Sequence, residues 1–292
     1  MQAITRARLA LEGLSVGDAF GEQLLHAGYA RGATLATRVA PVRGPWMWTD
    51  DTAMALSVID VLARHGGIDA HALALAFARR YVLEPARGYG RGAHEVLAAI
   101  ATGTPSEVAA RALFDGTGSC GNGGGMRAAP IGAYFAEDLA LVVEHARRSA
   151  LPTHAHPDGV AGAVAVAVAA ALVVSGERDP RRLLAGVVAH TPAGPTRANL
   201  ARAIALVDEE PATVATELGN GARVLSEDTI PFAVWCAATH LGDYAAGLWA
   251  CGDVGGDIDT TCAMVGGIVV GAVGLEGIPA AWRAAREPLP AE

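Results

Sequence analysis

The sequence is short of the residues that mark several common classes of protein. It has only four cysteines, with no CxxC spacing and no secretory leader before them, so we expect reduced thiols and a cytoplasmic location rather than a disulfide framework. Basic residues are also few, with 22 against 30 acidic residues and a net charge of −8. Because no basic stripe is present, a protein that binds a nucleic-acid backbone is not expected.

Long hydrophobic runs rich in Leu, Ile and Phe are missing as well, although the mean hydropathy of +0.31 raises the question of membrane spans. The longest candidates are residues 159–175, which carry no charge, and the shorter run 262–275. A membrane-spanning helix needs about 20 predominantly apolar residues. These two runs consist mainly of Ala, Gly and Val, whose small side chains let helix backbones approach closely. We therefore expect buried core helices and no membrane partner.

Strand patterns bounded by hairpin signals are also absent, and the dominant period is helical. In residues 52–64, Met54, Val58, Val61 and Leu62 share one face of a helix. No linker or internal repeat divides the chain, so we predict an all-α fold of ten or more helices in a single domain over residues 1–292. Further helical segments are predicted at 3–12, 69–83, 92–101, 106–114, 137–150, 181–190, 197–208, 212–219 and 241–250.

What the sequence does contain is two acidic clusters far apart in the chain. The first is Thr49-Asp50-Asp51-Thr52, which opens directly into the helical segment 52–64. Thr49 stands where a helix N-cap is expected, and carboxylates are stabilised at a helix N-terminus by its macrodipole. This cluster taken alone is therefore explained by helix capping as well as by a metal site.

The second cluster is Gly255-Gly256-Asp257-Ile258-Asp259-Thr260-Thr261, which precedes another apolar run. Capping explains it less well, because one cap needs one acceptor and not two acids with a threonine. Carboxylate and hydroxyl oxygens are hard ligands that suit Mg²⁺ or Mn²⁺ better than zinc or copper. If the two clusters meet, a bound cation would relieve the repulsion among four carboxylates. Together they favour a split metal site.

A glycine-rich segment lies between the clusters, from Gly118 to Gly125, and Met126-Arg127 follows it. Such a loop exposes backbone N–H groups that can bind an anion, although no Gly-Lys-Ser/Thr marks it as a Walker loop. Its alternative interpretation is a tight connection between packed helices. His154 and His156 follow at another predicted helix start, without the further nitrogen or sulfur ligands that a zinc site needs.

Taken in order, these segments resemble the ADP-ribosylglycohydrolase family, which includes dinitrogenase-reductase-activating glycohydrolases and ADP-ribosylarginine and ADP-ribosylserine hydrolases. The resemblance spans about residues 11–275. It implies an all-helical, orthogonally packed fold with two Mg²⁺ or Mn²⁺ ions in a cleft. The motifs that carry it are Gly17-Asp18-Ala19-Phe20-Gly21, Trp48-Thr49-Asp50-Asp51-Thr52, Ser119-Cys120-Gly121-Asn122-Gly123 with Met126-Arg127, Thr153-His154, and Gly255-Gly256-Asp257-Ile258-Asp259-Thr260.

The resemblance also implies roles for individual residues. The implied metal ligands are Thr49, Asp50, Asp51, Asp257, Asp259 and Thr260. The residues implied to lie against the diphosphate or ribose of ADP-ribose are Ser119, Gly121, Asn122, Gly123 and His154, with Arg127 bracing the loop. Asp50 and Asp259 are also expected to take part in catalysis, because two metal ions can orient the anomeric carbon and activate water.

The sequence departs from the family pattern at one position. Many members carry a catalytic glutamate four residues after the second glycine of the Gly-Asp-x-x-Gly motif, and this chain has Leu25 there. Glu22 lies three residues earlier, and if this segment is helical the two side chains share a face one turn apart. We therefore expect Glu22 to substitute, with Asp18 as a second candidate. A solvated helix glutamate is the alternative interpretation of Glu22.

These observations predict a metal-dependent hydrolase that releases ADP-ribose from an arginine or serine side chain or a related ADP-ribosylated molecule. Nucleic acid enters only as an ADP-ribosylated substrate. An ADP-ribose-binding member without activity is the second hypothesis, and a binuclear-metal hydrolase of phosphate esters is the third. The acceptor stays open, because we expect variable loops at 26–45, 84–92 and 221–230 to determine it.

Overall fold

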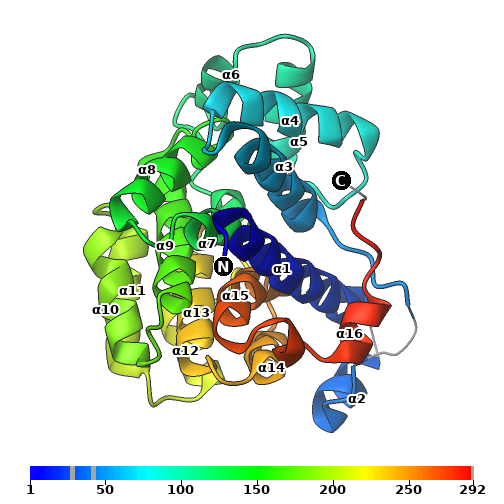
Figure 1. The fold of residues 1–292 in the computed structure, drawn as a ribbon, viewed down its shortest axis with the longest axis vertical. Helices are drawn as coiled ribbons and strands as arrows, with labels where there is room; N and C mark the ends of the chain where they lie inside the picture. The colour runs from blue at the N-terminus through cyan, green and yellow to red at the C-terminus, as the bar shows by residue number, and fades with distance from the viewer. Residues whose placement is uncertain (27–29, 41–43, 291–292) are drawn as a thin grey trace.

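The structure, a computed structural model, describes residues 1–26, 30–40 and 44–290, and in these ranges it contains helices and no β-strand (Figure 1). Two isolated β-bridges, Trp46–Arg286 and Gly121–Leu225, are the only strand-like pairings in the described residues. The predicted all-α fold is thus confirmed. The α-helices are α1 (Ala3–His26), α2 (Ala30–Thr37), α3 (Asp50–His65), α4 (Ala70–Leu83), α5 (Arg91–Ala101), α6 (Ser106–Ala112), α7 (Ala129–Tyr134), α8 (Leu139–Ala150), α9 (Pro157–Val174), α10 (Pro180–His190), α11 (Pro195–Ala203), α12 (Pro211–Leu218), α13 (Ser226–Thr239), α14 (Tyr244–Val254), α15 (Ile258–Val273) and α16 (Ala280–Ala285), with short 3₁₀ helices η1 (Asn122–Gly124), η2 (Ile204–Leu206) and η3 (Leu275–Gly277).

Most predicted segments coincide with a helix, but two differences concern regions that we expected to be loops. The expected loop 221–230 includes the start of α13, which begins at Ser226 and contains Pro231. Proline usually ends a helical pattern, yet here it lies near the helix start, where few intrahelical bonds are lost. The expected loop 26–45 contains α2, while its residues 27–29 and 41–43 lie outside the described ranges.

The closest helix pair is α1 against α15, and it depends on glycines spaced four residues apart on α1. A Cβ at Gly13 would lie 2.3 Å from the Gly266 carbonyl oxygen, and one at Gly17 would lie 2.2 Å from that of Cys262. A Cβ at Gly21 would lie 2.5 Å from the Cα of Asp259. Only glycine permits such backbone contact. The antiparallel packing brings the start of α15 to the end of α1.

Helix α9 is at the centre of the core. It is 18 residues long, it is apolar enough to cross a membrane by length and composition alone, and 83% of it is buried inside the protein. Its buried side chains are almost all Ala and Val, and α7, α8, α10, α13 and α15 pack around it. This burial agrees with the prediction of a core helix.

Aromatic side chains join the chain ends to the segment that precedes α3. Phe20 of α1 stacks on Trp282 of α16, with ring centroids 4.4 Å apart, and also contacts Trp46 and Trp249. The Trp46 N–H donates to the Ala285 carbonyl oxygen at 2.7 Å. This cluster fixes the polypeptide just before Thr49, where the first acidic cluster begins.

Candidate functional site

Asp18, in the middle of α1, holds the start of α3. Its carboxylate accepts hydrogen bonds from the backbone N–H groups of Thr49 (2.9 Å) and Thr52 (3.1 Å). It also accepts from both threonine hydroxyls. The first amides of a helix lack intrahelical acceptors, and here a side chain from another helix supplies one. Asp18 is therefore fully occupied as a cap, which makes it a positioning residue rather than a candidate acid.

Because Asp18 provides this cap, the Asp51 carboxylate is not needed for the same purpose. Thr49 is the N-cap residue of α3, but its hydroxyl is a long 3.4 Å from the Asp51 N–H. The Asp51 Oδ2 atom instead accepts from the Thr260 hydroxyl (3.4 Å) and lies 3.1 Å from the Thr49 hydroxyl oxygen, whose single proton is shared with Asp18. The capping interpretation of Asp51 is therefore not what the structure shows.

The Thr260–Asp51 contact also joins the two acidic clusters, which lie 209 residues apart in the chain. Asp257 stands at the N-cap position of α15, yet its side chain makes no capping hydrogen bond. Its Oδ2 atom accepts from the Asn122 side-chain amide at 2.6 Å. The structure thus brings together both helix starts and the glycine-rich segment, as the sequence predicts.

The aspartates of this region have raised pKa values because they are buried and lie close to one another. Burial and the neighbouring charge of Asp259 raise the pKa of Asp50 well above its usual range, and burial and Asp18 do the same to the pKa of Asp51. Burial, then Asp259, raises the pKa of Asp257 to about 7. Like charges in a low-dielectric site disfavour the ionised form. A cation placed among these carboxylates would reverse that effect.

Two carboxylate oxygens in the region are buried without a hydrogen-bond partner, Asp51 Oδ1 and Asp259 Oδ1. Buried acceptors are nearly always satisfied, so unpartnered ones need an explanation. Among the described residues, no three His, Cys, Asp or Glu side chains are grouped so as to hold a metal ion. The donors that meet here are instead mixed carboxylates and threonine hydroxyls, the hard oxygen set that suits Mg²⁺ or Mn²⁺.

Glu22 lies next to this cluster, one turn beyond Asp18 on α1. Its side chain is 22% exposed and forms an ion pair with His26 at 3.3 Å. Burial and the charge of Asp259 raise its pKa above the usual value. Leu25, by contrast, is 40% exposed. Of the two acids considered on this helix, Glu22 is the one whose carboxylate is not consumed by a helix cap.

The glycine-rich segment lies between Asp257 and His154. The Ser119 hydroxyl accepts from the Gly121 N–H at 3.2 Å, and the Asn122 N–H donates to the Val224 carbonyl at 3.1 Å. A Cβ at Gly123 would lie 3.3 Å from the His154 ring, and one at Gly121 would lie 3.8 Å from its Nε2 atom. All five predicted ligand-contacting residues are therefore gathered in one place.

Arg127 braces this segment from inside the protein, as expected. Its guanidinium is buried and donates to the Gly123 carbonyl (2.9 Å), the Ser149 carbonyl (3.0 Å) and the Thr153 hydroxyl (2.7 Å). It also lies 4.4 Å from the ring centroid of Phe77. Burial lowers the pKa of Arg127 to about 9, which leaves it charged at neutral pH.

The Thr153 hydroxyl connects Arg127 to His154, since it also lies 2.7 Å from the His154 Nδ1 atom. A hydroxyl that accepts from Arg127 can donate its single proton to Nδ1, which leaves the ring proton on Nε2. Burial, then Arg127, lowers the pKa of His154 to about 3. His154 is therefore neutral, and its Nε2–H faces the glycine-rich segment.

Three residues of the site were given no task in the sequence analysis. Thr153 was already part of the Thr153-His154 motif, but its contact with Arg127 could not be read from it. Thr229 accepts from the Asn122 side-chain amide at 3.1 Å, but it belongs to α13, which was not predicted. Tyr89 is buried beside Asp50, whose charge contributes to a raised pKa of the phenol. No pattern in the sequence connects Tyr89 to the acidic cluster.

The chain is similar to several known proteins. The chain is 30% identical to ADP-ribosylhydrolase ARH3 of Homo sapiens over 269 residues, which cover 81% of this chain and 73% of that protein. It is 31% identical to ADP-ribosylhydrolase ARH3 of Gallus gallus over 268 residues, covering 80% and 72%. An uncharacterised protein of Archaeoglobus fulgidus is 30% identical over 238 residues, covering 80% and 74%.

A solved structure described as an ADP-ribosylglycohydrolase-related protein complex superimposes with a TM-score of 0.68 and 23% identity, covering 98% of this chain and 93% of that chain. This likeness shows the fold. The sequence profile of the ADP-ribosylglycohydrolase family matches residues 1–290, nearly the whole chain. The protein therefore belongs to the ADP-ribosylglycohydrolase family of glycosyl hydrolases.

Proposed function

We propose that the protein hydrolyses the glycosidic bond between ADP-ribose and a modified arginine or serine side chain, or a related ADP-ribosylated molecule, with two Mg²⁺ or Mn²⁺ ions. The observation that carries the proposal is the pair of buried, unpartnered oxygens, Asp51 Oδ1 and Asp259 Oδ1. They come from two different helix starts, and a threonine hydroxyl joins those starts.

The cation ligands in this proposal are Thr49, Asp50, Asp51, Asp257, Asp259 and Thr260. Bound Mg²⁺ or Mn²⁺ would supply Lewis acidity for the ribose hydroxyls and lower the pKa of a bound water. Asp18 keeps the Thr49 end of this set in place through its hydrogen bonds to the first turn of α3. Asn122 orients Asp257 in the same way from the other side.

Glu22 is the residue that we assign to proton transfer. Glycoside hydrolysis passes through an oxocarbenium-like state and needs an acid or base close to the anomeric carbon. A carboxyl group whose pKa is raised by burial and by Asp259 suits this role, because it holds a proton more readily than an exposed glutamate does. Asp50 and Asp259 complete the proposed catalytic set by positioning the ribose.

The ADP part of the substrate is assigned to the glycine-rich segment. The Gly121 and Asn122 N–H groups are already bonded to the Ser119 hydroxyl and the Val224 carbonyl, so the donor assigned to a diphosphate or ribose oxygen is the His154 Nε2–H, which faces this segment. Ser119 and Asn122 shape this wall through their bonds to Gly121 and Asp257.

One observation favours a second candidate function, an ADP-ribose-binding protein without turnover. The position expected for the family glutamate is Leu25, which is exposed and carries no acid. If Glu22 does not replace that acid, the donor wall and the carboxylate cluster would still bind ADP-ribose and a cation.

The test is release of ADP-ribose from ADP-ribosylated arginine, ADP-ribosylated serine and ADP-ribose 1″-phosphate, with Mg²⁺, Mn²⁺ or EDTA. We expect cation-dependent release from at least one substrate, loss of release in Asp259→Asn, and a fall in kcat of about 100-fold in Glu22→Gln. Glu12→Gln is the matched control, because Glu12 lies on the same helix and pairs with Arg286 outside the site.

Each other outcome points to a different conclusion. Unchanged turnover in Glu22→Gln beside an inactive Asp259→Asn would remove Glu22 from the mechanism. Calorimetric binding of ADP-ribose without release from any substrate would select the binding protein. Release of inorganic phosphate in place of ADP-ribose would overturn the glycosidase assignment.

A further inference from the structure

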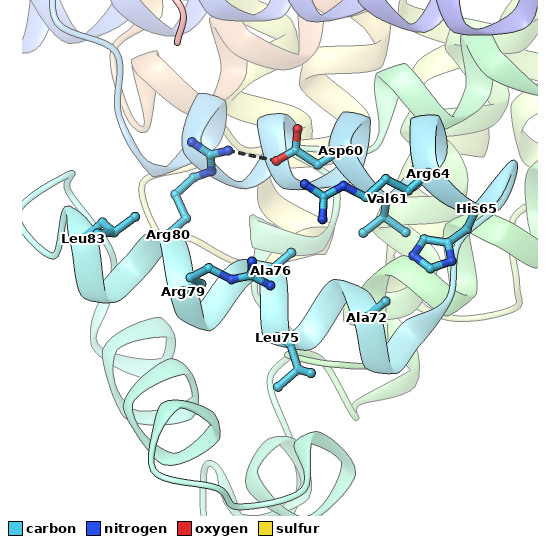
Figure 2. A pocket seen from close by; sticks show the side chains of 10 residues that line it. All are labelled: Asp60, Val61, Arg64, His65, Ala72, Leu75, Ala76, Arg79, Arg80 and Leu83. Carbon is cyan, nitrogen blue, oxygen red and sulfur yellow. Dashed lines mark hydrogen bonds and ion pairs between the residues drawn. The ribbon is translucent and has the colours of Figure 1, made fainter. Parts of the chain in front are cut away.

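A groove outside the acidic site runs between α3 and α4 and encloses about 260 Å³ (Figure 2). Three guanidinium groups line it: Arg64 from α3, and Arg79 and Arg80 from α4. Figure 2 shows these groups along the space between the two helices. The sequence gives no hint of a basic stripe, because Arg64 and the Arg79–Arg80 pair are brought together only by the packing of the helices.

In the part of the chain that the structure describes, two of the three arginines have no acidic partner. Arg80 pairs with Asp60 at 3.1 Å and also donates to the Ser57 hydroxyl. Among the residues that the structure describes, neither Arg64 nor Arg79 forms an ion pair. On a chain with a net charge of −8, two unneutralised guanidiniums in one groove form a local cationic surface.

The groove also presents apolar side chains. Val61 is buried at its floor, while Leu75 and Leu83 at its edges are 44% and 75% exposed. Protein–protein interfaces combine apolar side chains at their centre with polar or charged side chains at their rim. The exposed leucines and the arginines without an ion pair give the groove both kinds of contact.

We propose that this groove binds an acidic, partly apolar segment of a partner protein, with carboxylates on Arg64 and Arg79 and apolar side chains on Leu75 and Leu83. Arginine suits this task because its planar fork matches a carboxylate. A nucleic acid fits less well, because its backbone would extend from a short groove that contains Asp60 onto a protein with excess negative charge.

The position of the groove relates it to the acidic site. Leu83 is followed directly by segment 84–90, and a Cβ at Gly88 of that segment would lie 3.6 Å from the Asp50 Oδ1 atom. A partner lying along α4 would therefore approach Asp50. We identify this partner with the ADP-ribosylated substrate, and that identification rests on the proposed function. Binding of an acidic segment in the groove does not depend on the proposed function.

The experiment measures fluorescence anisotropy of a labelled, unmodified peptide that alternates glutamate and leucine, titrated with the full chain. We expect the double variant Arg64→Glu/Arg79→Glu to weaken binding about tenfold, and Arg64→Gln/Arg79→Gln to weaken it less, because exposed ion pairs contribute modestly. Added salt should weaken wild-type binding. The matched control is Arg111→Glu/Arg147→Glu, which makes the same charge change at two exposed arginines outside the groove.

Equal weakening in the control variant would reduce the effect to net charge and overturn the proposal. Unchanged affinity in the groove variants would also overturn it, as would tighter binding of a labelled single-stranded oligonucleotide that the groove variants abolish. ADP-ribose release from a small substrate should be the same in wild type and groove variants. A protein inactive on every substrate that still binds the peptide would contradict the proposed function alone.

Discussion

At the scale of single residues, the carboxylates of the site differ in what their oxygens contact. Asp18 is surrounded by donors from Thr49 and Thr52, whereas Asp51 and Asp259 each keep one buried oxygen without a partner. Residues of one type thus differ in their contacts: all the donors around Asp18 come from the start of α3, whereas the other two each have an oxygen that no protein donor satisfies.

Asp18→Ala should destabilise the protein more than loss of an ordinary helix cap. The change leaves the Thr49 and Thr52 amides and two hydroxyls without their buried acceptor, so we expect the free energy of unfolding to fall by about 3 kcal/mol. Asp69→Ala removes the exposed cap of α4 and should cost about 1 kcal/mol. Urea unfolding of both variants measures the difference, and equal losses would contradict the role of Asp18.

Thr153→Val should change the tautomer of His154. The variant keeps the shape of threonine but removes the hydroxyl between Arg127 and His154, so the ring proton is no longer directed to Nε2. Nitrogen-15 NMR of the histidine ring should show one tautomer in wild type and a mixture in Thr153→Val. We also expect a rise in KM of about fivefold, corresponding to one hydrogen bond. Thr153→Ser should restore both, and an unchanged NMR signal in Thr153→Val would refute the relay.

The lowered pKa of His154 should also make the stability of the protein depend on pH. Its pKa is about 3 in the folded protein and about 6.5 in an unfolded chain. The unfolded state therefore binds a proton first, and this residue reduces stability as the pH falls below 6.5, by up to about 1.4 kcal/mol per pH unit. The free energy of unfolding of wild type, compared with His154→Gln, should fall progressively between pH 6.5 and 5. A constant difference over that interval would be inconsistent with a buried neutral histidine.

Residue types and order in the sequence were sufficient to predict which segments form the site, because the two acidic clusters and the glycine-rich segment each carry a local signal. The task of Asp18 could not be predicted in the same way. It depends on where α1 meets α3, and no property of residues 17–21 alone distinguishes a helix cap from a free acid.

At the scale of helices, the contact between α1 and α15 determines whether the second acidic cluster reaches the first. The glycines at 13, 17 and 21 lower the helix propensity of α1, which is why periodicity predicted helix only over 3–12 while the structure continues it to His26. The same glycines allow the backbone contact that a larger residue would prevent. Local propensity and tertiary packing oppose each other here, and packing prevails.

Gly17→Ala tests this contact. The added methyl group would overlap the Cys262 carbonyl, so we expect a loss of about 2 kcal/mol of stability despite the better helix propensity of alanine. Gly242→Ala is the control, because nothing lies within 4 Å of the position of its Cβ. Thermal unfolding should show a lower Tm for the first variant and no comparable loss for the second. A Gly17→Ala protein as stable as wild type would mean that the helices separate at little cost.

Helix α13 is an element that the sequence analysis did not predict at all. We expected a variable loop over 221–230 and predicted no helix over 226–239, yet burial of Ile230, Phe232 and Trp235 in the core stabilises a helix there despite Pro231. Thr229 reaches the site only because that helix forms, so one missed element also removed one site residue from the prediction.

At the scale of the whole molecule, a cation that bridges the two acidic clusters would couple ligand binding to folding. Mg²⁺ or Mn²⁺ should raise the Tm. At a free cation concentration 100 times the dissociation constant, the free energy of unfolding should increase by about 2.7 kcal/mol. Asp51→Asn should abolish this gain while leaving the metal-free protein at least as stable as wild type, because one repelling carboxylate is removed.

Asp115→Asn, an exposed position outside the site, is the control for that measurement and should keep the full response to the cation. Thermal unfolding in EDTA and in each cation compares the three proteins. An identical rise in Tm for wild type and Asp51→Asn would place the cation elsewhere.

Helix α3 sets a fixed separation between the acidic site at its first turn and the arginine groove near its last turns. From Asp51 to Arg64 the helix rises about 20 Å, at 1.5 Å per residue. An extended peptide covers that length in about six residues. If one partner protein occupies both sites, its acidic residues should lie at a preferred number of residues from its ADP-ribosylated side chain. The length of α3 would then select substrates by the distance between these two features of their sequence.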